Sequence, residues 1–393
     1  MAAAETVAAM TVEIIPITDK AELRRFIRVP FLVHKNDRTW VPPLLSEREE
    51  AFTPSKNEFL RRSEVRFWMA RRDGKDIGRI SAQIDPLAQK EDGPAIGHFG
   101  CLSAIDDPEV FGALFEAAEG FLHSRGTRRV HGPFTLSINE ETGLLIDGFD
   151  TQPMMMMGHD PVYLADHVEA AGYRRQSDVL AYLLDLDRPL PKSARNMLER
   201  PLASSVVMRR LNLKDYDNEV RRIVSIFNDA WSENEGFVPM TEPETDELAT
   251  RLKLLLDERL VWFAEVNGEP VAFIVVLPNI NEAIRDLDGR LFPFGIAKLL
   301  WRLKVKGLKS ARVPLMGVRK SLAGTVLGSA LPLQLIGAVW PNAKKLGFRW
   351  IELSWILEKN RPMRSILERL GAEAYKTYRI YEKALDDGVA HLN

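Results

Sequence analysis

The feature that most constrains the fold is an order of predicted elements that occurs twice along the chain. Each half has a two-stranded hairpin, then a strand, a helix, a strand, a helix and a last strand. In the first half these elements are predicted at residues 65–70, 77–84, 98–105, 107–123, 128–132, 163–171 and 178–186. In the second half they are predicted at residues 260–266, 270–277, 313–318, 325–346, 350–356, 361–370 and 375–382, after amphipathic helices at 216–234 and 248–256. Two α/β domains follow from this repeated order.

Length and local turn signals agree with two domains. The chain has 393 residues, which is more than one typical core holds. Asn267-Gly268 favours a tight hairpin turn, whereas Pro332 and Pro341 predict interruptions of the helix at 325–346. The expected divisions are a flexible tail at 1–10, a domain at 11–187, a linker at 188–205, a domain at 206–385 and a tail at 386–393.

Composition excludes several classes of protein. No apolar run reaches the roughly 18 residues that a membrane-spanning helix needs. The first ten residues lack the basic start and apolar stretch of a secretory signal. The single cysteine, Cys101, excludes an internal disulfide. We therefore expect a cytoplasmic protein. Peripheral attachment to the inner face of the cytoplasmic membrane is compatible with this expectation.

One stretch of the second half resembles a known family. It runs from Glu358 to Pro362 (EKNRP) and from Ile366 to Ala372 (ILERLGA). It resembles the fifth strand, the asparagine and the following helix of the GNAT acyltransferases, and residues 168–173 (VEAAGY) are a weaker copy. The resemblance implies an α/β protein of two fused GNAT-like domains, each a mixed, mostly antiparallel twisted sheet flanked by helices. It also implies acyl transfer from acyl-CoA to an amine.

The resemblance places the pyrophosphate loop of the acyl-CoA site at residues 319–325, where Leu322 replaces the family's first glycine. Small residues there let backbone N–H groups approach the pyrophosphate, and the next helix offers its positive end. The first half has the acidic Asp106-Asp107 at the corresponding position, so acyl-CoA is expected in the second half. A Gly-rich turn with solvated basic residues is the alternative. The expected donor-binding residues are Gly317, Val318, Arg319, Lys320, Ala323, Gly324, Thr325 and Asn360.

Charge is unevenly distributed along the second half. Residues 291–351 contain eleven lysines and arginines but no aspartate or glutamate, where composition alone predicts about eight acids. At 290–312 the basic residues alternate with Phe, Leu and Trp in an insertion that a minimal domain of this type does not need. Such a segment fits an interfacial helix on an anionic membrane, or the wall of a channel for a fatty chain. An ordinary surface helix is the alternative, and no nucleic-acid partner is expected because no such module is recognisable.

The catalytic requirements are those of amide formation. An amine attacks the thioester directly, so the site must hold both reactants, remove a proton and polarise the carbonyl. No nucleophile elbow, phosphate-binding Walker loop or metal-ligand spacing occurs, so no metal is expected. The family's tyrosine acid falls at Leu367, and Tyr375 or Tyr378 are the substitutes. The catalytic candidates are Glu140, Glu141, Glu282 and Tyr378, although capping or surface roles are common for such glutamates.

The two acidic segments, 137–143 and 278–282, also resemble a bacterial group linked to ceramide synthesis. This resemblance implies a long-chain acyl-CoA donor and the amine of a sphingoid base, a lipid amine, as acceptor. Two alternatives stay open, namely a soluble amine acceptor, for which 291–312 would pack as ordinary core, and an inactive module that binds acyl-CoA or lipid. The expected substrate-binding residues are Asn139, His159, Tyr163, Asn281 and Trp301.

Overall fold

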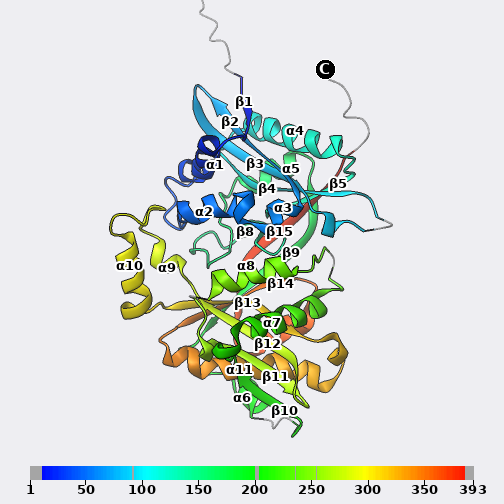
Figure 1. Cartoon of the computed structure of the whole chain (residues 1–393), viewed down its shortest axis with the longest axis vertical. Helices are drawn as coiled ribbons and strands as arrows, with labels where there is room; N and C mark the ends of the chain where they lie inside the picture. Colours follow the sequence, from blue (N-terminus) through cyan, green and yellow to red (C-terminus); the bar gives the residue numbers. More distant parts are fainter. Residues whose placement is uncertain (1–10, 91–92, 200–202, 235, 254, 386–393) are drawn as a thin grey trace, which may run out of the picture.

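The structure is a computed structural model that describes residues 11–90, 93–199, 203–234, 236–253 and 255–385 (Figure 1). The expected tails at 1–10 and 386–393 lie outside the described residues. Nearly all described strands belong to one mixed sheet, in the order β1-β2-β3-β4-β5-β15-β9-β14-β13-β12-β11-β10, with β8 paired to β15. Helices cover both faces of the sheet, so the expected α/β class is confirmed.

The first half supplies one end of the sheet. Its strands are β1 (Glu13–Pro16), β2 (Glu64–Arg72), β3 (Lys75–Ile84), β4 (Ile96–Ala104), β5 (Arg129–Gly132), β8 (Leu144–Asp147) and β9 (Arg174–Asp185), with β6 (Phe134–Thr135) and β7 (Glu141–Thr142) forming a separate pair. Its helices are α1 (Lys20–Val33), α2 (Leu45–Ala51), α3 (Glu58–Arg62), α4 (Pro108–Ser124) and α5 (Leu164–Ala170). The segment expected to be a linker contains α6 (Lys192–Leu198).

The second half repeats the plan. Its strands are β10 (Val206–Arg210), β11 (Val261–Val266), β12 (Glu269–Pro278), β13 (Ser310–Val318), β14 (Trp350–Leu357) and β15 (Glu373–Ala384). Its helices are α7 (Tyr216–Trp231), α8 (Glu242–Leu252), α9 (Asn281–Ile284), α10 (Gly295–Trp301), which continues as a π-helical stretch over Arg302–Lys306, α11 (Val326–Lys345) and α12 (Arg361–Arg369).

Alternation along β12 shows how helices cover both faces of the sheet. Ile274 and Val276 belong to a core with Leu335 of α11, whereas Phe273 and Val275 belong to a core on the α7 side. This is the period-two pattern of a strand buried on both faces. The helix α11 spans 20 residues without a break, although two prolines were expected to interrupt it. Each proline removes one helical N–H donor, and the apolar face of α11 keeps its contacts with the sheet throughout.

The last strands of the two halves are exchanged. In the centre of the sheet β9 of the first half pairs antiparallel with β14 of the second, with Leu184 opposite Ile351. The final strand β15 crosses back and pairs antiparallel with β5, with Tyr381 opposite Gly132, and also with β9 (Figure 1). The exchange joins the two halves through backbone hydrogen bonds. Element order alone did not predict it, because it depends on partners far apart in the sequence.

Candidate active site

The described strands form two parallel pairs, one in each half, and both pairs are short. In the second half β13 and β14 pair from Ser310–Trp350 to Val313–Leu353 and then diverge. In the first half β4 and β5 pair only from Ile96–Arg129 to His98–His131. Diverging parallel strands leave a gap in the sheet that backbone, side chains or a ligand must fill.

In the first half the gap is filled by the protein's own backbone. A Cβ atom on Gly100 of β4 would lie 1.7 Å from the carbonyl oxygen of Phe134, so that backbone already rests against the glycine. The Gln83 amide donates hydrogen bonds to the carbonyl oxygens of Phe134 (2.9 Å) and Leu136 (3.0 Å), which fixes the segment in place. Between β4 and β5 there is therefore no room for a pantetheine chain.

In the second half the gap opens into a cavity of about 570 Å³. Pro314 and Leu315 of β13, and Trp355 and Leu357 of β14, line it where the two strands separate. The rest of the wall comes from the first half, from α7, α8 and the segment between them, from β12 and β15, and from residues 358–362 at the start of α12, and it is mostly apolar. Its large apolar members include Phe134, Ile138, Met156, Phe227, Phe237 and Leu252. The wall also carries polar side chains, among them Asn139, Arg312 and Asn360, and an apolar cavity with polar groups in its wall is typical of a small-molecule site.

A buried polar cluster borders this cavity. The Arg312 guanidinium has no exposed surface, and its Nε lies 3.3 Å from the Glu352 carboxylate, which is equally buried. Arg312 Nε donates to Ser354 Oγ (2.8 Å), and Ser354 Oγ donates to Glu352 Oε1 (2.6 Å). Tyr375 donates to the other oxygen of Glu352, and burial followed by the Glu352 charge raises the pKa of this phenol. The Arg312 guanidinium also stacks on the Trp355 ring, 4.6 Å from its centroid.

Sequence reasoning missed Arg312, which lines the cavity. The signal that could have found it was Glu352, an acidic residue on a strand predicted to be buried, because a buried carboxylate needs a cationic partner. Two first-half histidines, His98 and His131, also line the cavity and were not singled out. Burial, and then the proximity of His131, lowers the pKa of His98 to about 4, so that ring is neutral at pH 7.

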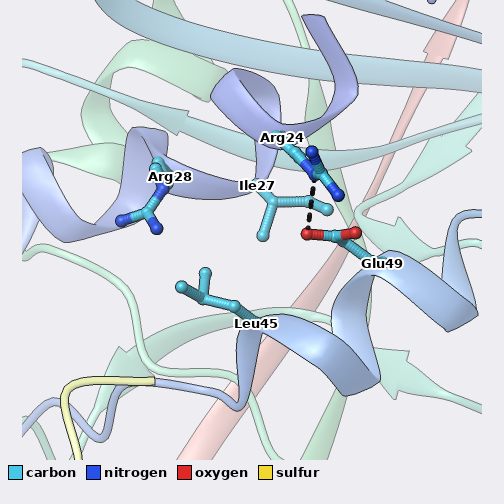
Figure 2. Close-up of a pocket in the computed structure, with 5 residues that line it drawn as sticks. All are labelled: Arg24, Ile27, Arg28, Leu45 and Glu49. Atoms are coloured by element: carbon cyan, nitrogen blue, oxygen red, sulfur yellow. Dashed lines mark hydrogen bonds and ion pairs between the residues drawn. The ribbon is translucent and has the colours of Figure 1, made fainter. Parts of the chain in front are cut away.

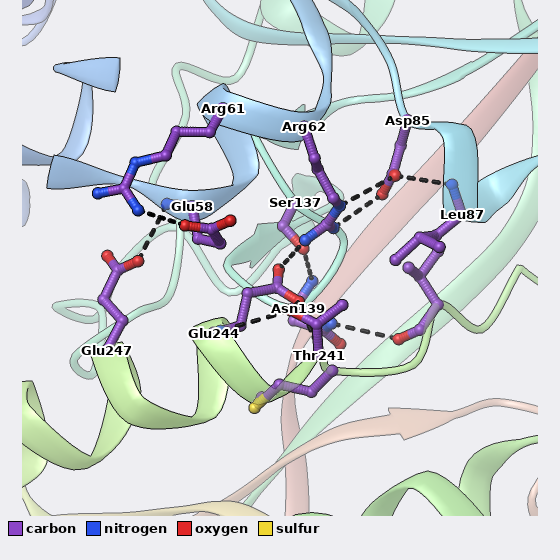
Figure 3. A network of polar contacts seen from close by, with 12 residues as sticks. Glu58, Arg61, Arg62, Asp85, Leu87, Ser137, Asn139, Thr241, Glu244 and Glu247 are labelled. Atoms are coloured by element: carbon purple, nitrogen blue, oxygen red, sulfur yellow. Dashed lines mark hydrogen bonds and ion pairs between the residues drawn. The ribbon is translucent and has the colours of Figure 1, made fainter. Parts of the chain in front are cut away.

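The wall of the cavity formed by α8 is tied to the first half (Figure 3). Arg62 of α3 forms ion pairs with Glu244 of α8 (2.5 Å) and with Asp85 (3.1 Å). The backbone N–H of Glu58 donates to the Glu247 carboxylate at 3.0 Å. These contacts bring the two halves together beside the cavity.

Of the expected donor-binding residues, Asn360 lines the cavity and caps α12, where its side chain accepts from the Met363 N–H at 3.2 Å. The loop at 319–325 precedes α11, and Thr325 is the N-cap of that helix. Ala323 N–H is bonded within this loop, and Gly324 has φ +72. None of these loop residues lines the cavity.

Two carboxylates that the sequence analysis did not predict contact this loop. The Lys320 N–H donates to the Asp229 carboxylate (2.8 Å), and its ammonium group lies 3.3 Å from Glu233. Arg319 donates to Ser225 Oγ at 3.1 Å. Both acids lie on or just after α7, so nothing in the local sequence of the loop indicated them. Gly317 and Val318 pair with β12 as ordinary members of β13.

The candidate acids and bases have separate surroundings. Glu141 forms an ion pair with Arg48 and accepts from Thr135 at 3.3 Å. Glu140 is half-buried, and burial is the main reason that its pKa rises to about 8. The Glu282 carboxylate accepts the N–H groups of Lys309 and Ser310, and so anchors the start of β13.

Tyr378 is fully buried, and its hydroxyl donates to the Gly158 carbonyl at 3.2 Å. Burial, followed by the charge of Glu352, raises its pKa well above the usual value of a tyrosine. The structure therefore does not gather the four catalytic candidates into one constellation, and none of them lines the cavity.

The expected substrate-binding residues are dispersed. Asn139 lines the cavity, and its amide donates to the Val238 carbonyl (3.3 Å) across the two halves. His159 contacts Asp37 at 2.9 Å, and burial lowers the pKa of its ring. Tyr163 donates to the Ala104 carbonyl and Asn281 to the Pro153 carbonyl. Trp301 is half exposed at 52% on the insertion.

A second hollow, of about 270 Å³, lies between α1 and α2 (Figure 2). Its carboxylate, Glu49, is held by Arg24 at 3.1 Å. Across the described ranges there is no cluster of three or more metal-ligating side chains. None of the helices that the structure describes is both long and apolar enough to span a bilayer.

Comparison with known proteins identifies the family. The chain is 51% identical over 373 residues to the bacterial ceramide synthase of Caulobacter vibrioides, a match that covers 95% of this chain and 97% of that protein. The chain belongs to the bacterial ceramide synthase family. It is also 44% identical over 367 residues to protein YghO of Escherichia coli K12, which covers 93% of this chain and 94% of YghO.

No family model matches the chain. Among solved structures, a tandem GNAT protein from the clavulanic acid biosynthesis pathway superposes with a TM-score of 0.55 at 15% identity, covering 95% of this chain and 98% of that one. A GCN5-related N-acetyltransferase from Sphaerobacter thermophilus gives 0.51 at 13% identity, with coverages of 96% and 97%. These likenesses confirm the tandem GNAT fold. Membership of the ceramide synthase family makes the chain an acyl-CoA-dependent N-acyltransferase.

Proposed function

We propose that this member of the ceramide synthase family transfers a long-chain acyl group from acyl-CoA to the amine of a sphingoid-type long-chain base. The observation that carries the proposal is the apolar cavity where β13 and β14 separate, because both substrates have long hydrocarbon chains. A relative named for ceramide synthesis, 51% identical over nearly the whole chain, favours this acceptor over a soluble amine. We place the enzyme in the cytoplasm.

The donor would approach from the second half. Its thioester would lie between β13 and β14, with the loop at 319–325 and the first turn of α11 holding the phosphates. In support, the corresponding gap of the first half is filled by the backbone of Phe134. Asp229 and Glu233 oppose a phosphate beside Lys320, so the anion would have to displace these contacts. Asn360, which lines the cavity between β13 and β14, is the second donor-binding candidate.

The chemistry requires a base but no covalent enzyme intermediate. The amine nitrogen forms a bond to the thioester carbon, the C–S bond breaks, one amine proton passes to a base, and the thiolate of CoA takes up a proton. Among the candidates, Glu140 has the pKa best matched to accepting a proton near neutral pH, about 8. Glu282 is the weakest candidate, since both of its oxygens accept backbone N–H groups.

The proposal is tested by incubating the purified chain with palmitoyl-CoA and a panel of amines. Release of free thiol is measured, and the products are identified by mass spectrometry. The panel is sphinganine, its 3-keto form, an amino acid and a polyamine. An N-acylated long-chain base is the expected product. Turnover with a soluble amine alone would overturn the lipid acceptor. Acyl-CoA binding without thiol release would instead favour the inactive binding module.

A further inference from the structure

The insertion between β12 and β13 carries apolar side chains that nothing in the described structure covers. Phe292 and Phe294 are 78% and 79% exposed, and Val305 is 72% exposed. Ile296, Leu300 and Trp301 on the same segment are also exposed. We call these six residues the insertion patch. Single exposed apolar side chains are common on proteins, but six within fourteen residues, including three aromatic rings, mark an interaction surface.

The same segment is nevertheless anchored to the protein. Leu299 and Leu303 pack against the core of the second half, and Leu291 packs against a small cluster with Leu287 and Val41. In Figure 1 α10 lies at the edge of the molecule. The insertion is therefore apolar on two sides. One side packs against the core, as in an ordinary surface helix, and the other side remains exposed.

The charged residues around the insertion patch indicate which kind of surface it can bind. From residue 285 to 309 the chain has seven basic and two acidic residues. One of the acids, Asp286, is held by Lys298 (2.6 Å) and Arg302 (2.5 Å), so its charge is offset locally. Lys304 and Lys306 are exposed next to Val305. Aromatic and aliphatic side chains flanked by cations match the headgroup region of an anionic bilayer, where rings enter the interface and ammonium groups meet phosphate.

We propose that the insertion patch docks the enzyme on the surface of an anionic lipid bilayer. The segment leads directly into β13, whose Arg312 and Leu315 line the cavity. Docking would therefore hold the active-site strand near the lipid phase, where an insoluble amine is found. The docking itself requires no catalysis, so it can fail or succeed independently of the proposed acceptor.

The test is sedimentation of the full chain with vesicles of phosphatidylcholine and phosphatidylglycerol, and with vesicles of phosphatidylcholine alone. The wild type should bind the anionic vesicles more strongly, and added salt should weaken that binding. Substituting Phe292→Ser and Phe294→Ser together should reduce partitioning by about tenfold or more, and Lys304→Glu with Lys306→Glu should remove the preference for anionic lipid. Val326→Ser is the matched control, because Val326 is 90% exposed but lies outside the insertion.

Absence of binding by the wild type to either kind of vesicle would overturn the proposal. Equal loss in the Val326→Ser control, or full binding by the double phenylalanine variant, would also overturn it. Light scattering tests whether the insertion patch binds a second copy of the chain and not a bilayer. If the double phenylalanine variant converts a dimer to a monomer while the wild type ignores vesicles, the insertion patch binds a second copy of the chain instead.

Discussion

Arg312 of β13 and Glu352 of β14 form an ion pair in which neither side chain has any exposed surface. Ser354 bridges the pair with two hydrogen bonds, and Tyr375 of β15 donates to the second carboxylate oxygen. Burial lowers the pKa of Arg312, and the charge of Glu352 opposes that shift. Side chains from β13, β14 and β15 thus meet in one cluster at the wall of the cavity, although β9 lies between β14 and β15 in the sheet.

Neutralising Glu352 should be strongly destabilising. Glu352→Gln keeps the shape of the side chain but leaves the Arg312 charge buried without a counter-charge, at a cost of about 3–5 kcal/mol. Urea denaturation measures the loss. The control is Asp187→Asn, which removes an ion pair with Arg349 whose side chains are more than half exposed, and it should cost less than about 1 kcal/mol. Equal losses in the two variants would contradict a special role for the buried pair.

Adding a methyl group at Gly100 should destabilise the folded structure of the first half. The new Cβ would lie 1.7 Å from the Phe134 carbonyl oxygen, which is backbone and cannot simply turn aside. We expect Gly100→Ala to cost about 3 kcal/mol or more in denaturation experiments. Gly112→Ala is the matched control, since that glycine lies on α4 with nothing within 4 Å, and it should stabilise by about 0.5–1 kcal/mol. A tolerated Gly100→Ala would mean that the Phe134 segment can move.

These two sites show what could and could not be predicted from the sequence. The helix predicted at 361–370 is α12, because its signals are local, and Asn360, expected from the resemblance to bind the donor, is its N-cap. Arg312 was not predicted as a site residue, since its partners Glu352 and Ser354 are 40 and 42 positions along the chain and meet it only when β13 and β14 pair in parallel. The closed gap at Gly100 depends in the same way on a loop more than 30 residues later. Short-range sequence patterns therefore predict the helices and strands, whereas the site depends on contacts between distant segments that such patterns do not predict.

Glu140 should make stability fall as pH rises. Its pKa is raised from 4.5 to about 8, so between these values the folded state holds a proton that the unfolded state has lost. Its contribution to stability is complete below pH 4.5 and is lost as pH rises toward 8. Glu140→Gln should therefore be more stable than the wild type at pH 8, by an amount that shrinks toward pH 4.5. Denaturation midpoints across this range measure the difference, and parallel curves for the two proteins would contradict the shifted pKa.

The same residue makes a prediction about catalysis. If Glu140 is the base, kcat/KM should rise with pH and level off above about 8, because only the carboxylate accepts a proton. Glu140→Gln should lower kcat about 100-fold or more and leave KM nearly unchanged. A variant that keeps its rate and its pH profile would exclude Glu140 as the base, whatever its effect on stability.

Narrowing the cavity should change which acyl chain the enzyme accepts. Leu357 of β14 lines the cavity, and tryptophan at this position would take up volume where β13 and β14 separate. Under the proposed function, Leu357→Trp should lower kcat/KM for palmitoyl-CoA relative to hexanoyl-CoA by about tenfold, the usual scale of a steric effect in an apolar pocket. Competition between the two donors, with free thiol and product masses as readouts, measures the ratio. Val207→Trp is the control, because Val207 is 53% exposed on β10 and outside the cavity, so its ratio should stay that of the wild type. If Leu357→Trp folds normally and leaves the ratio unchanged, the acyl chain does not occupy this cavity, and the donor has to be placed elsewhere.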